Sequence, residues 1–316
     1  MRVVFMGTPE FSVGALDALV ADPRFDVVAV YTQPDKPVGR GLELREPPVK
    51  KAALRHGLPV SQPEKLTQPG EFEKLQALAP DVIVVVAYGQ ILRKNVLELP
   101  RLGCVNIHSS LLPRWRGAAP IQWAILGGDA ESGVATMKLV EKLDAGDVLM
   151  TARTPIAADD TAQTLHDRLA RMGAELIGPT LAGLDDGSVR GEKQDESKVT
   201  YASKLSKEME WLDAAAKPAT DLDRQIRALH PWPGTSVMAQ GQRLKIKRAK
   251  LSDVQGPAGR LFEKFGMLLL GTPKGSLELQ AVQWEGKKET DAAGFMNGLK
   301  GRNVPLPLET TCPPKS

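Results

Sequence analysis

Four short apolar runs in the first third of the chain constrain its fold more than any other feature. Each is apolar at consecutive positions over the length of one strand, which is typical of a strand buried on both faces. Helical patterns, such as residues 13–20 and 48–56, separate them. This alternation predicts an α/β fold with a parallel-rich sheet covered by helices on both faces. The four runs are Val3 to Met6, Val27 to Tyr31, Val82 to Ala87 and Cys104 to Ile107.

The turn after the first run has the sequence Gly7-Thr8-Pro9-Glu10. We expect Thr8 to cap the following helix and Pro9 to occupy its first position. The turn lacks the GxGxxG spacing of a dinucleotide site, so no dinucleotide is assigned to it. The predicted fold is therefore Rossmann-like without that cofactor.

Further along, two more strands and one long helix are predicted. The strands span Gly133 to Val140 and Val148 to Thr154, and Thr161 opens the amphipathic helix. Residues 185–207 are polar and show little apolar periodicity, which is typical of a linker. We predict a first domain at residues 1–190, a linker at 191–207 and a C-terminal domain at 208–316.

The C-terminal region has a different pattern. After a helix predicted at residues 219–229, short alternating or apolar runs are separated by Gly-containing turns, which predicts a small β-barrel. We expect His230-Pro231-Trp232-Pro233-Gly234 to form an ordered turn that packs Trp232 against this barrel. The runs are Arg243 to Leu251, Arg260 to Glu263, Met267 to Leu270 and Ser276 to Trp284.

Asn106 and His108 lie two residues apart at the end of the fourth apolar run. Strand side chains alternate between faces, so both should point to the same side. Ligands of open α/β sheets bind at the carboxyl ends of strands. An amide donor beside an imidazole suits the stabilisation of an oxyanion that develops on a carbonyl group. Taken alone, the pair is better explained by a strand-end histidine bonded to a neighbouring loop.

Composition excludes several classes of protein. No apolar run approaches the ~18–20 residues of a membrane span. The first residues resemble neither a signal peptide nor a transit peptide, so we expect a bacterial cytoplasmic protein. Cys104 and Cys312 do not suggest a disulfide framework, and the four histidines lack metal-ligand spacing, so we expect no metal.

Positive charge is concentrated late in the chain. Residues 208–316 carry 16 Lys and Arg against 12 Asp and Glu, whereas residues 1–207 are nearly balanced. The excess gathers between Arg243 and Lys250, where alternation places Leu244 and Ile246 on one strand face and basic side chains on the other. Such a stripe is either a solvated outer face or a contact for a phosphate backbone.

Two linked motifs resemble the 10-formyltetrahydrofolate-dependent formyltransferases. They are Asn106-x-His108-x-Ser110-Leu111-Leu112-Pro113-x-x-Arg116-Gly117-x-x-Pro120 and Leu143-Asp144-x-Gly146-Asp147. Other segments are similar to the members that act on initiator methionyl-tRNA, and the resemblance runs from residue 2 to about residue 300. These segments are Phe5 to Phe11, Gln33 to Gly41, Val86 to Leu92 and His230 to Gly234.

The resemblance implies a Rossmann-like formyltransferase domain followed by a smaller OB-like β-barrel domain that binds tRNA. It implies transfer of the formyl group of 10-formyltetrahydrofolate to the amino group of initiator methionyl-tRNA, which gives N-formylmethionyl-tRNA for translation initiation. We expect no metal and no membrane contact, and we expect a monomer.

The resemblance also assigns roles to residues. Asn106, His108 and Asp144 are the expected catalytic residues. Arg40 matches an arginine that reaches the acceptor end of the tRNA, although Leu42-Glu43-Leu44 stands where the family has basic residues. The basic stripe adds Lys245 and Lys247 as tRNA contacts. The expected folate contacts are Gln90, Ile91, Leu92, Ser110, Leu111, Leu112, Pro113 and Leu139.

Two alternatives remain open on the sequence. The first is a formyltransferase or deformylase that acts on a small molecule, such as a ribonucleotide amine or an amino sugar. The second is a tRNA-binding or RNA-binding module whose Rossmann-like domain has lost catalysis. The extra basic domain disfavours the first, and the complete set of Asn106, His108 and Asp144 disfavours the second.

Overall fold

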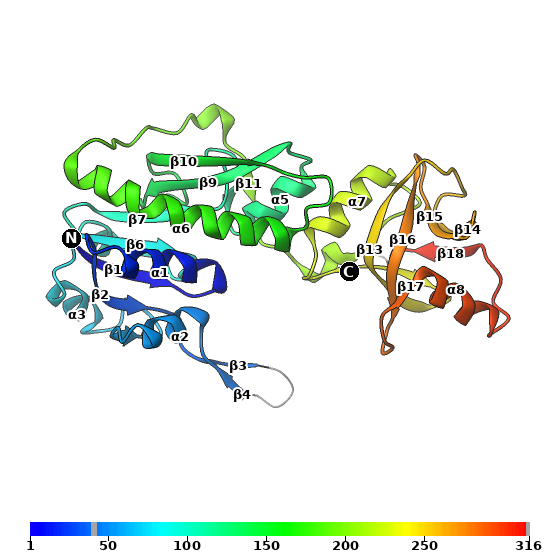
Figure 1. The fold of residues 1–316 in the computed structure, drawn as a ribbon, viewed down its shortest axis with the longest axis horizontal. Helices are drawn as coiled ribbons and strands as arrows, with labels where there is room; N and C mark the ends of the chain where they lie inside the picture. The colour runs from blue at the N-terminus through cyan, green and yellow to red at the C-terminus, as the bar shows by residue number, and fades with distance from the viewer. Residues whose placement is uncertain (39–42, 314–316) are drawn as a thin grey trace. The chain divides into compact units, whose positions relative to one another are not determined.

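The computed structural model describes residues 1–38 and 43–313, and the chain divides into two compact units. The first unit comprises Met1–Pro120, Glu131–Pro155 and His166–Ala202. The second comprises Ile121–Ala130, Ile156–Leu165 and the chain from Ser203 onward. Each unit has its own sheet and its own hydrophobic core (Figure 1).

A seven-stranded sheet forms the centre of the first unit, in the order β10-β9-β7-β6-β1-β2-β5. β1, β2, β5, β6 and β7 are mutually parallel, and β9 and β10 are antiparallel additions at one edge. All four predicted apolar runs are strands of this sheet, which confirms the parallel-rich Rossmann-like fold. The strands are β1 Arg2–Gly7, β2 Asp26–Tyr31, β5 Val60–Ser61, β6 Val82–Val86, β7 Cys104–His108, β9 Glu131–Lys138 and β10 Val148–Pro155.

Helices cover both faces of this sheet (Figure 1). A Cβ on Gly173 of α6 would lie 2.8 Å from Ile107 of β7, so α6 packs on the face to which Ile107 points. Cys104 of the same strand belongs to a cluster on the opposite face, with Leu75 of α3 and Val96 of α4. The helices around this sheet are α1 Val13–Ala21, α2 Pro48–Arg55, α3 Glu71–Ala77, α4 Lys94–Leu97 and α6 Ala162–Asp186.

The first strand-to-helix turn differs from the expectation. Thr8 does not cap the helix, because its hydroxyl donates to the Tyr88 carbonyl oxygen at 2.9 Å. The helix instead begins with a short 3-10 turn, η1 (Glu10–Ser12), whose flanking residue is Pro9. Thr8 therefore joins the loop after β1 to the loop after β6, at the carboxyl edge of the sheet.

Several short elements connect the main ones. β3 (Lys36–Val38) and β4 (Glu43–Arg45) form an antiparallel pair. β8 (Arg116–Gly117) pairs with β11 (Tyr201–Ala202). The remaining ones are α5 Pro120–Leu126, η2 Glu196–Lys198 and η3 Lys207–Glu210.

The second unit is built on a closed antiparallel barrel. Six strands follow one another in the order β13-β12-β18-β14-β15-β16, and pairing of β16 with β13 closes the ring. The alternation predicted for the basic stretch is confirmed, since Leu244 and Ile246 are buried in the barrel core. The elements are α7 Ala219–Ala228, β12 Thr235–Ala239, β13 Gln242–Ser252, β14 Arg260–Lys264, β15 Met267–Gly271, β16 Ser276–Trp284, β17 Thr290–Asp291, α8 Ala292–Lys300 and β18 Leu308–Thr311.

The segment from His230 to Pro233 forms a turn, as expected, and Trp232 within it is 54% exposed. Among the described residues, no helix is long and apolar enough to cross a bilayer.

Candidate active site

Asn106 and His108 project from β7 on the face opposite α6. They share that face with Cys104, because they lie two and four residues after it on the same strand. His108 is only 6% exposed, whereas Asn106 is partly exposed. Among the described residues, the Asn106 amide makes no hydrogen bond, so its donors are available to a ligand.

Asp144 lies close to His108, although 36 positions separate them in the sequence. Asp144 Oδ2 is 3.8 Å from His108 Nδ1, and its side chain is 11% exposed. The same oxygen accepts a hydrogen bond from the Gly117 backbone N–H at 2.8 Å. The structure therefore brings a carboxylate against the imidazole, as the resemblance implies, at a distance longer than a hydrogen bond.

The loop between β9 and β10 holds Asp144 in a conformation that few residues adopt. Its φ is +47°, in the left-handed region. Two residues later, a Cβ on Gly146 would lie 1.8 Å from the Lys138 carbonyl oxygen, so only glycine fits. The D-x-G spacing thus has a physical cause, because the loop must pass against the end of β9 immediately after the aspartate.

His108 has one ring nitrogen engaged by the protein. Nε2 lies 3.0 Å from the Trp115 carbonyl oxygen. A carbonyl only accepts, so Nε2 must carry the hydrogen in this contact. In the neutral ring, Nδ1 is then the basic nitrogen, and it faces Asp144. The arrangement can accept a proton at Nδ1 and stabilise the resulting cation with the carboxylate.

Some of the residues expected to contact folate are buried in the protein, and others are exposed. Leu92 is buried in the cluster on the Cys104 face of the sheet, and Leu139 packs against that cluster. Their neighbours Ile91 and Val140 are exposed by 82% and 45%. Large apolar side chains exposed beside a strand-end site form the kind of surface that a flat ligand covers.

Gln90 has its side chain engaged within the protein. Its carbonyl oxygen accepts from the Leu66 N–H, and its amide donates to the Pro63 carbonyl, both at 2.9 Å. Gln90 therefore ties the loop after β6 to the chain after β5. Its side-chain nitrogen is engaged by the Pro63 and Glu64 carbonyl oxygens, so a ligand would meet its backbone or the second lone pair of its side-chain oxygen.

The expected loop Ser110 to Pro113 follows β7 directly. Ser110 is 1% exposed, and its hydroxyl donates to the Arg114 carbonyl oxygen at 2.7 Å. Leu111 and Leu112 are partly exposed. The loop is thus closed on itself by Ser110 and leaves apolar side chains at its surface.

Arg40, the expected contact for the tRNA acceptor end, lies outside the described residues. Flanking it, Leu44 of β4 is 72% exposed. Lys50 does not add free positive charge beside β3 and β4, because its ammonium group pairs with Asp35 at 2.7 Å and with Glu46 at 3.1 Å.

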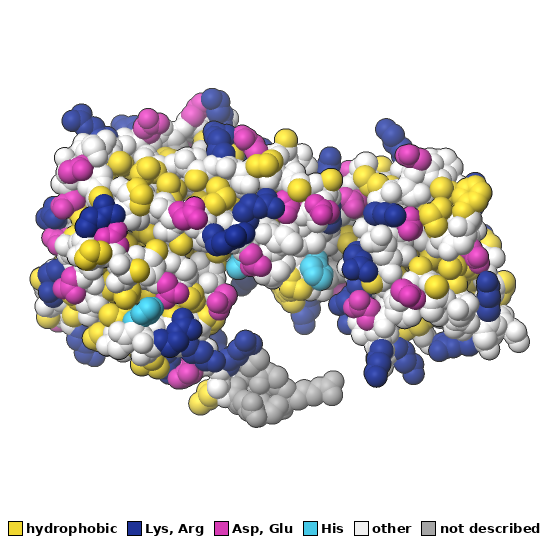
Figure 2. Space-filling model, viewed as in Figure 1, with side chains coloured by type: hydrophobic (Ala, Val, Ile, Leu, Met, Phe, Trp, Pro, Cys, Tyr) yellow, Lys and Arg dark blue, Asp and Glu magenta, His cyan; other side chains and the backbone are white. Residues whose placement is uncertain are grey.

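The basic stripe on β13 is only partly neutralised. Arg243 pairs with Glu210, and Lys250 lies 3.2 Å from Glu278. Within the part of the chain that the structure describes, Lys245 and Lys247 have no ion-pair partner. Their charges are therefore available to an anionic ligand. On the face shown in Figure 2, basic side chains are interspersed with acidic ones over both units, so the overall bias is modest.

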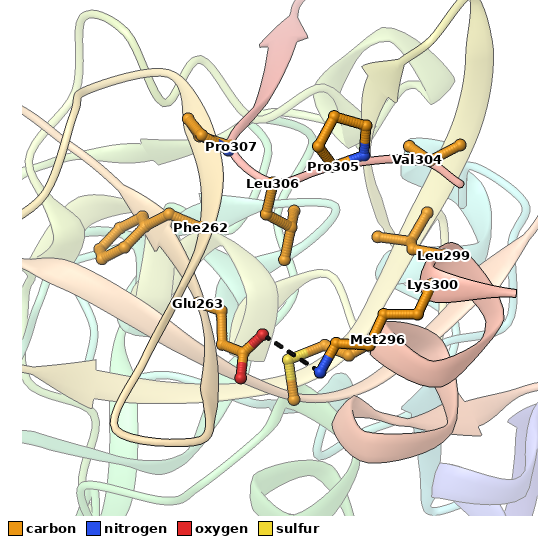
Figure 3. Close-up of a pocket in the computed structure, with 9 residues that line it drawn as sticks. All are labelled: Phe262, Glu263, Met296, Leu299, Lys300, Val304, Pro305, Leu306 and Pro307. Atoms are coloured by element: carbon orange, nitrogen blue, oxygen red, sulfur yellow. Dashed lines mark ion pairs between the residues drawn. The ribbon is translucent and has the colours of Figure 1, made fainter. Parts of the chain in front are cut away.

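A cavity of about 660 Å³ opens beside this stripe in the second unit. Basic side chains predominate among its charged lining residues, and Asp159, Asp223 and Glu289 supply the acidic ones. The basic lining residues, counting histidine, are Arg227, His230, Lys247, Arg248 and Lys250. A second cavity of about 270 Å³ lies between β14 and α8 (Figure 3). Its lining is mostly apolar, and its only charged groups, Glu263 and Lys300, pair with each other at 3.7 Å.

Residues missed by the sequence analysis surround the predicted ones. Gln194 and Thr200, which were assigned to the linker, contact the loops that carry Asp144 and Trp115. Across the described chain, no group of three or more His, Cys, Asp or Glu side chains is placed to hold a metal ion.

The fold and this strand-end site define a class of Rossmann-like enzymes with an appended barrel. The family described as formyl transferase matches residues 1–181, and its C-terminal domain matches residues 204–300. The chain therefore belongs to the formyl transferase family.

Close relatives within this family share nearly the whole chain. The methionyl-tRNA formyltransferase of Halorhodospira halophila is 48% identical over 307 residues, which are 95% of this chain and 96% of that protein. The methionyl-tRNA formyltransferase of Methylococcus capsulatus is 49% identical over 308 residues, 96% of this chain and 99% of the relative.

Solved structures share the fold at lower identity. The sugar 3N-formyl transferase WlaRD, solved in the presence of dTDP and 5-N-formyl-THF, is 18% identical with a TM-score of 0.66, over 91% of this chain and 99% of that one. HypX from Aquifex aeolicus in complex with tetrahydrofolic acid is also 18% identical, with a TM-score of 0.63 over 95% of this chain. This chain spans 48% of HypX.

Proposed function

We propose that this protein transfers the formyl group of 10-formyltetrahydrofolate to the free amino group of initiator methionyl-tRNA, giving N-formylmethionyl-tRNA. The observation that carries the proposal is the near-full-length similarity to relatives named methionyl-tRNA formyltransferase, over both units. The site geometry supports it independently, because an amide, an imidazole and a carboxylate gather at one strand end. We further propose a monomer that acts in the bacterial cytoplasm without a metal.

In the proposed mechanism, Asn106 donates its amide hydrogen to the oxygen of the formyl group. The amine adds to the formyl carbon, and the oxygen becomes an oxyanion that this donor stabilises. His108 takes the proton of the attacking amine at Nδ1, and Asp144 stabilises the imidazolium that forms. The carbon–nitrogen bond to N10 then breaks, and the same proton passes from His108 to the departing nitrogen.

A strong base is not required. An α-amine beside an ester loses its proton near or below the reference pKa of ~7.7–8.0, so much of the substrate is nucleophilic at neutral pH. Positioning and electrostatic stabilisation therefore supply most of the acceleration. This fits a site whose carboxylate lies 3.8 Å from the imidazole rather than within hydrogen-bond distance.

We place the folate along the apolar surface beside the strand end. Ile91, exposed by 82%, and Leu111 and Leu112 would cover one side of the pterin. Leu92, Leu139 and Pro113 would form the floor, with Ser110 holding the loop. Gln90 would contribute its backbone, because its side-chain nitrogen is engaged.

We assign tRNA binding to the second unit and to Arg40. Lys245 and Lys247 are free of ion pairs within the described residues, and Arg248 of the same strand lines the cavity beside Lys247, whereas Arg227 and Lys250 of that cavity are paired with Asp223 and Glu278. Phosphate contacts of this kind give affinity that falls with salt. The proposed division of labour places chemistry in the first unit and most tRNA affinity in the second.

A comparison of acceptors tests the proposed function. The purified protein is supplied with labelled 10-formyltetrahydrofolate and, separately, initiator methionyl-tRNA, an amino-sugar nucleotide or glycinamide ribonucleotide. We expect label only in the tRNA. Faster labelling of a small amine would replace the proposed acceptor, and binding of tRNA without any labelling would favour the catalytically inactive binding module.

A further inference from the structure

The segment from Gln194 to Ala202, beyond the end of α6, lies against the active-site turn Trp115 to Ala118. The Trp115 N–H donates to the Thr200 hydroxyl at 2.9 Å. The Arg116 and Ala118 N–H groups donate to the carbonyl oxygens of Thr200 and Ala202, both at 2.9 Å. The turn that supplies the partner of His108 is therefore held by chain that comes about 80 residues later.

The contact between these segments is close. Gly117 has a φ of +121°, and a Cβ at this position would lie 2.6 Å from the Ala202 carbonyl oxygen. Gly117 is also the residue whose N–H donates to Asp144. The backbone of the later segment thus fixes the position of the Gly117 N–H, which donates to the Asp144 carboxylate.

Gln194 reaches the loop of Asp144 directly. Its amide nitrogen donates to the Asp144 carbonyl oxygen at 2.8 Å and to the Gly146 carbonyl oxygen at 2.7 Å. Its side-chain oxygen accepts from Arg116 Nε at 3.0 Å. One neutral amide therefore joins both active-site loops, and its nitrogen donates to two carbonyl oxygens of the Asp144 loop.

Arg116 also binds the later segment through its guanidinium group. Its side chain is fully buried, and Nη2 donates to Glu196 at 2.8 Å. Glu196 also pairs with Lys142 at 2.8 Å, two residues before Asp144. The hydrogen bonds from Arg116 and Lys142 lower the pKa of Glu196 to about 2.

We propose that Gln194 is a positioning residue, which holds Asp144 at its distance from His108 by bonding the backbone on both sides of Ala145. The inference rests on the proposed function, because it assumes that Asp144 acts on His108 during formyl transfer. Gln194 itself is far along the chain and acts through Asp144 rather than on the substrate.

The substitution Gln194→Glu separates positioning from a merely structural role. A carboxylate still accepts from Arg116, but it cannot donate to the two carbonyl oxygens. We expect a fall in kcat of about ten- to a hundredfold, with KM for tRNA and for folate unchanged. Lys193→Gln, an exposed neighbour with the same change of net charge, is the matched control and should retain wild-type rates.

The combination with Asp144→Asn tests whether the effect passes through Asp144. In that background Gln194→Glu should cost less than about twofold. An equal loss in both backgrounds, wild-type kcat in Gln194→Glu, or a rise in KM alone would each overturn the proposal. If Gln194→Glu does not fold, Gln194→Asn, which is neutral but one methylene shorter, is expected to give the same pattern.

A second readout does not depend on the acceptor. Hydrogen–deuterium exchange of residues 139–147 should be faster in Gln194→Glu than in wild type and in Lys193→Gln. Unchanged exchange would overturn the positioning role even if turnover fell. Failure of the wild-type protein to formylate methionyl-tRNA would instead count against the proposed function, and the exchange measurement would still decide the role of Gln194.

Discussion

Replacement of Asp144 by Asn is the sharpest test of the proposed chemistry. Asn keeps an oxygen that accepts from the Gly117 N–H and tolerates the left-handed conformation at this position, so the fold should survive. The change removes only the negative charge that lies 3.8 Å from His108 Nδ1. Any large loss of rate is therefore a loss of electrostatic stabilisation.

The expected magnitude follows from this distance. Two unit charges about 4 Å apart attract by about 4 kcal/mol at an effective dielectric constant of ~20, which is an upper limit for the effect on the transition state. Loss of one group that stabilises developing charge typically costs ~2.7–4 kcal/mol. We therefore expect kcat to fall by about 10²–10³.

Single-turnover formylation of methionyl-tRNA measures this loss without interference from product release. Glu141→Gln, which removes an exposed carboxylate from the same loop, is the control and should retain wild-type turnover. Combining Asp144→Asn with Asn106→Ala or His108→Ala should cost much less than the product of the single effects, because the three residues act as a unit. Near-wild-type turnover in Asp144→Asn, or an equal loss in Glu141→Gln, would refute the reasoning.

Three other outcomes are expected. Lys247→Ala should raise KM for tRNA and reduce by about one unit the slope of log tRNA affinity against log salt concentration. Lys250→Ala should change both quantities less, because Lys250 is already paired with Glu278. Equal effects of the two substitutions would remove Lys247 as a phosphate contact. The folded-state pKa of Glu196 is lowered to about 2, so Glu196→Gln should destabilise the protein above about pH 4.5. The difference in free energy of unfolding between the variant and wild type should vanish as pH falls toward 2. A difference that does not change with pH in chemical denaturation would contradict this. Burial raises the pKa of Cys104 to about 12, so one thiol, Cys312, should react with a thiol reagent at pH 8 and the second only after unfolding.

Continuous apolar patterns predicted the main strands well. β1, β2, β6 and β7 are buried on both faces, so their sequences are apolar at nearly every position. The direction of β9 and β10 was not predictable in the same way, because an apolar run carries no information about parallel or antiparallel pairing. Short elements such as β8 and β11, each two residues long, leave no periodic pattern at all.

The site was only partly accessible from the sequence. Asn106 and His108 could be paired because two positions on one strand share a face. Asp144 required a resemblance to known proteins, since its neighbour in space is 36 positions away in the chain. Gln194 was missed because it lies in a polar stretch where nothing local distinguishes it from a linker residue, and its role depends on contacts with Asp144 and Arg116.

Thr8 and Trp232 show how tertiary contacts override local expectations. Thr8 is a residue type that commonly caps helices, but its hydroxyl donates instead to the Tyr88 carbonyl oxygen, which only the folded sheet brings near. Trp232 was expected to pack against the barrel from an ordered turn, yet more than half of its surface is exposed. Both positions depend on surroundings that are distant in sequence.

Transfer of the formyl carbon itself tests the central claim most directly. The protein is incubated with 10-formyltetrahydrofolate labelled in the formyl carbon and with charged initiator tRNA, either free or acetylated at the amino group. We predict that one label per tRNA appears as formylmethionine on the free amine, and that the acetylated tRNA stays unlabelled. Label in the acetylated tRNA, or release of labelled formate without any formylmethionine, would contradict the account.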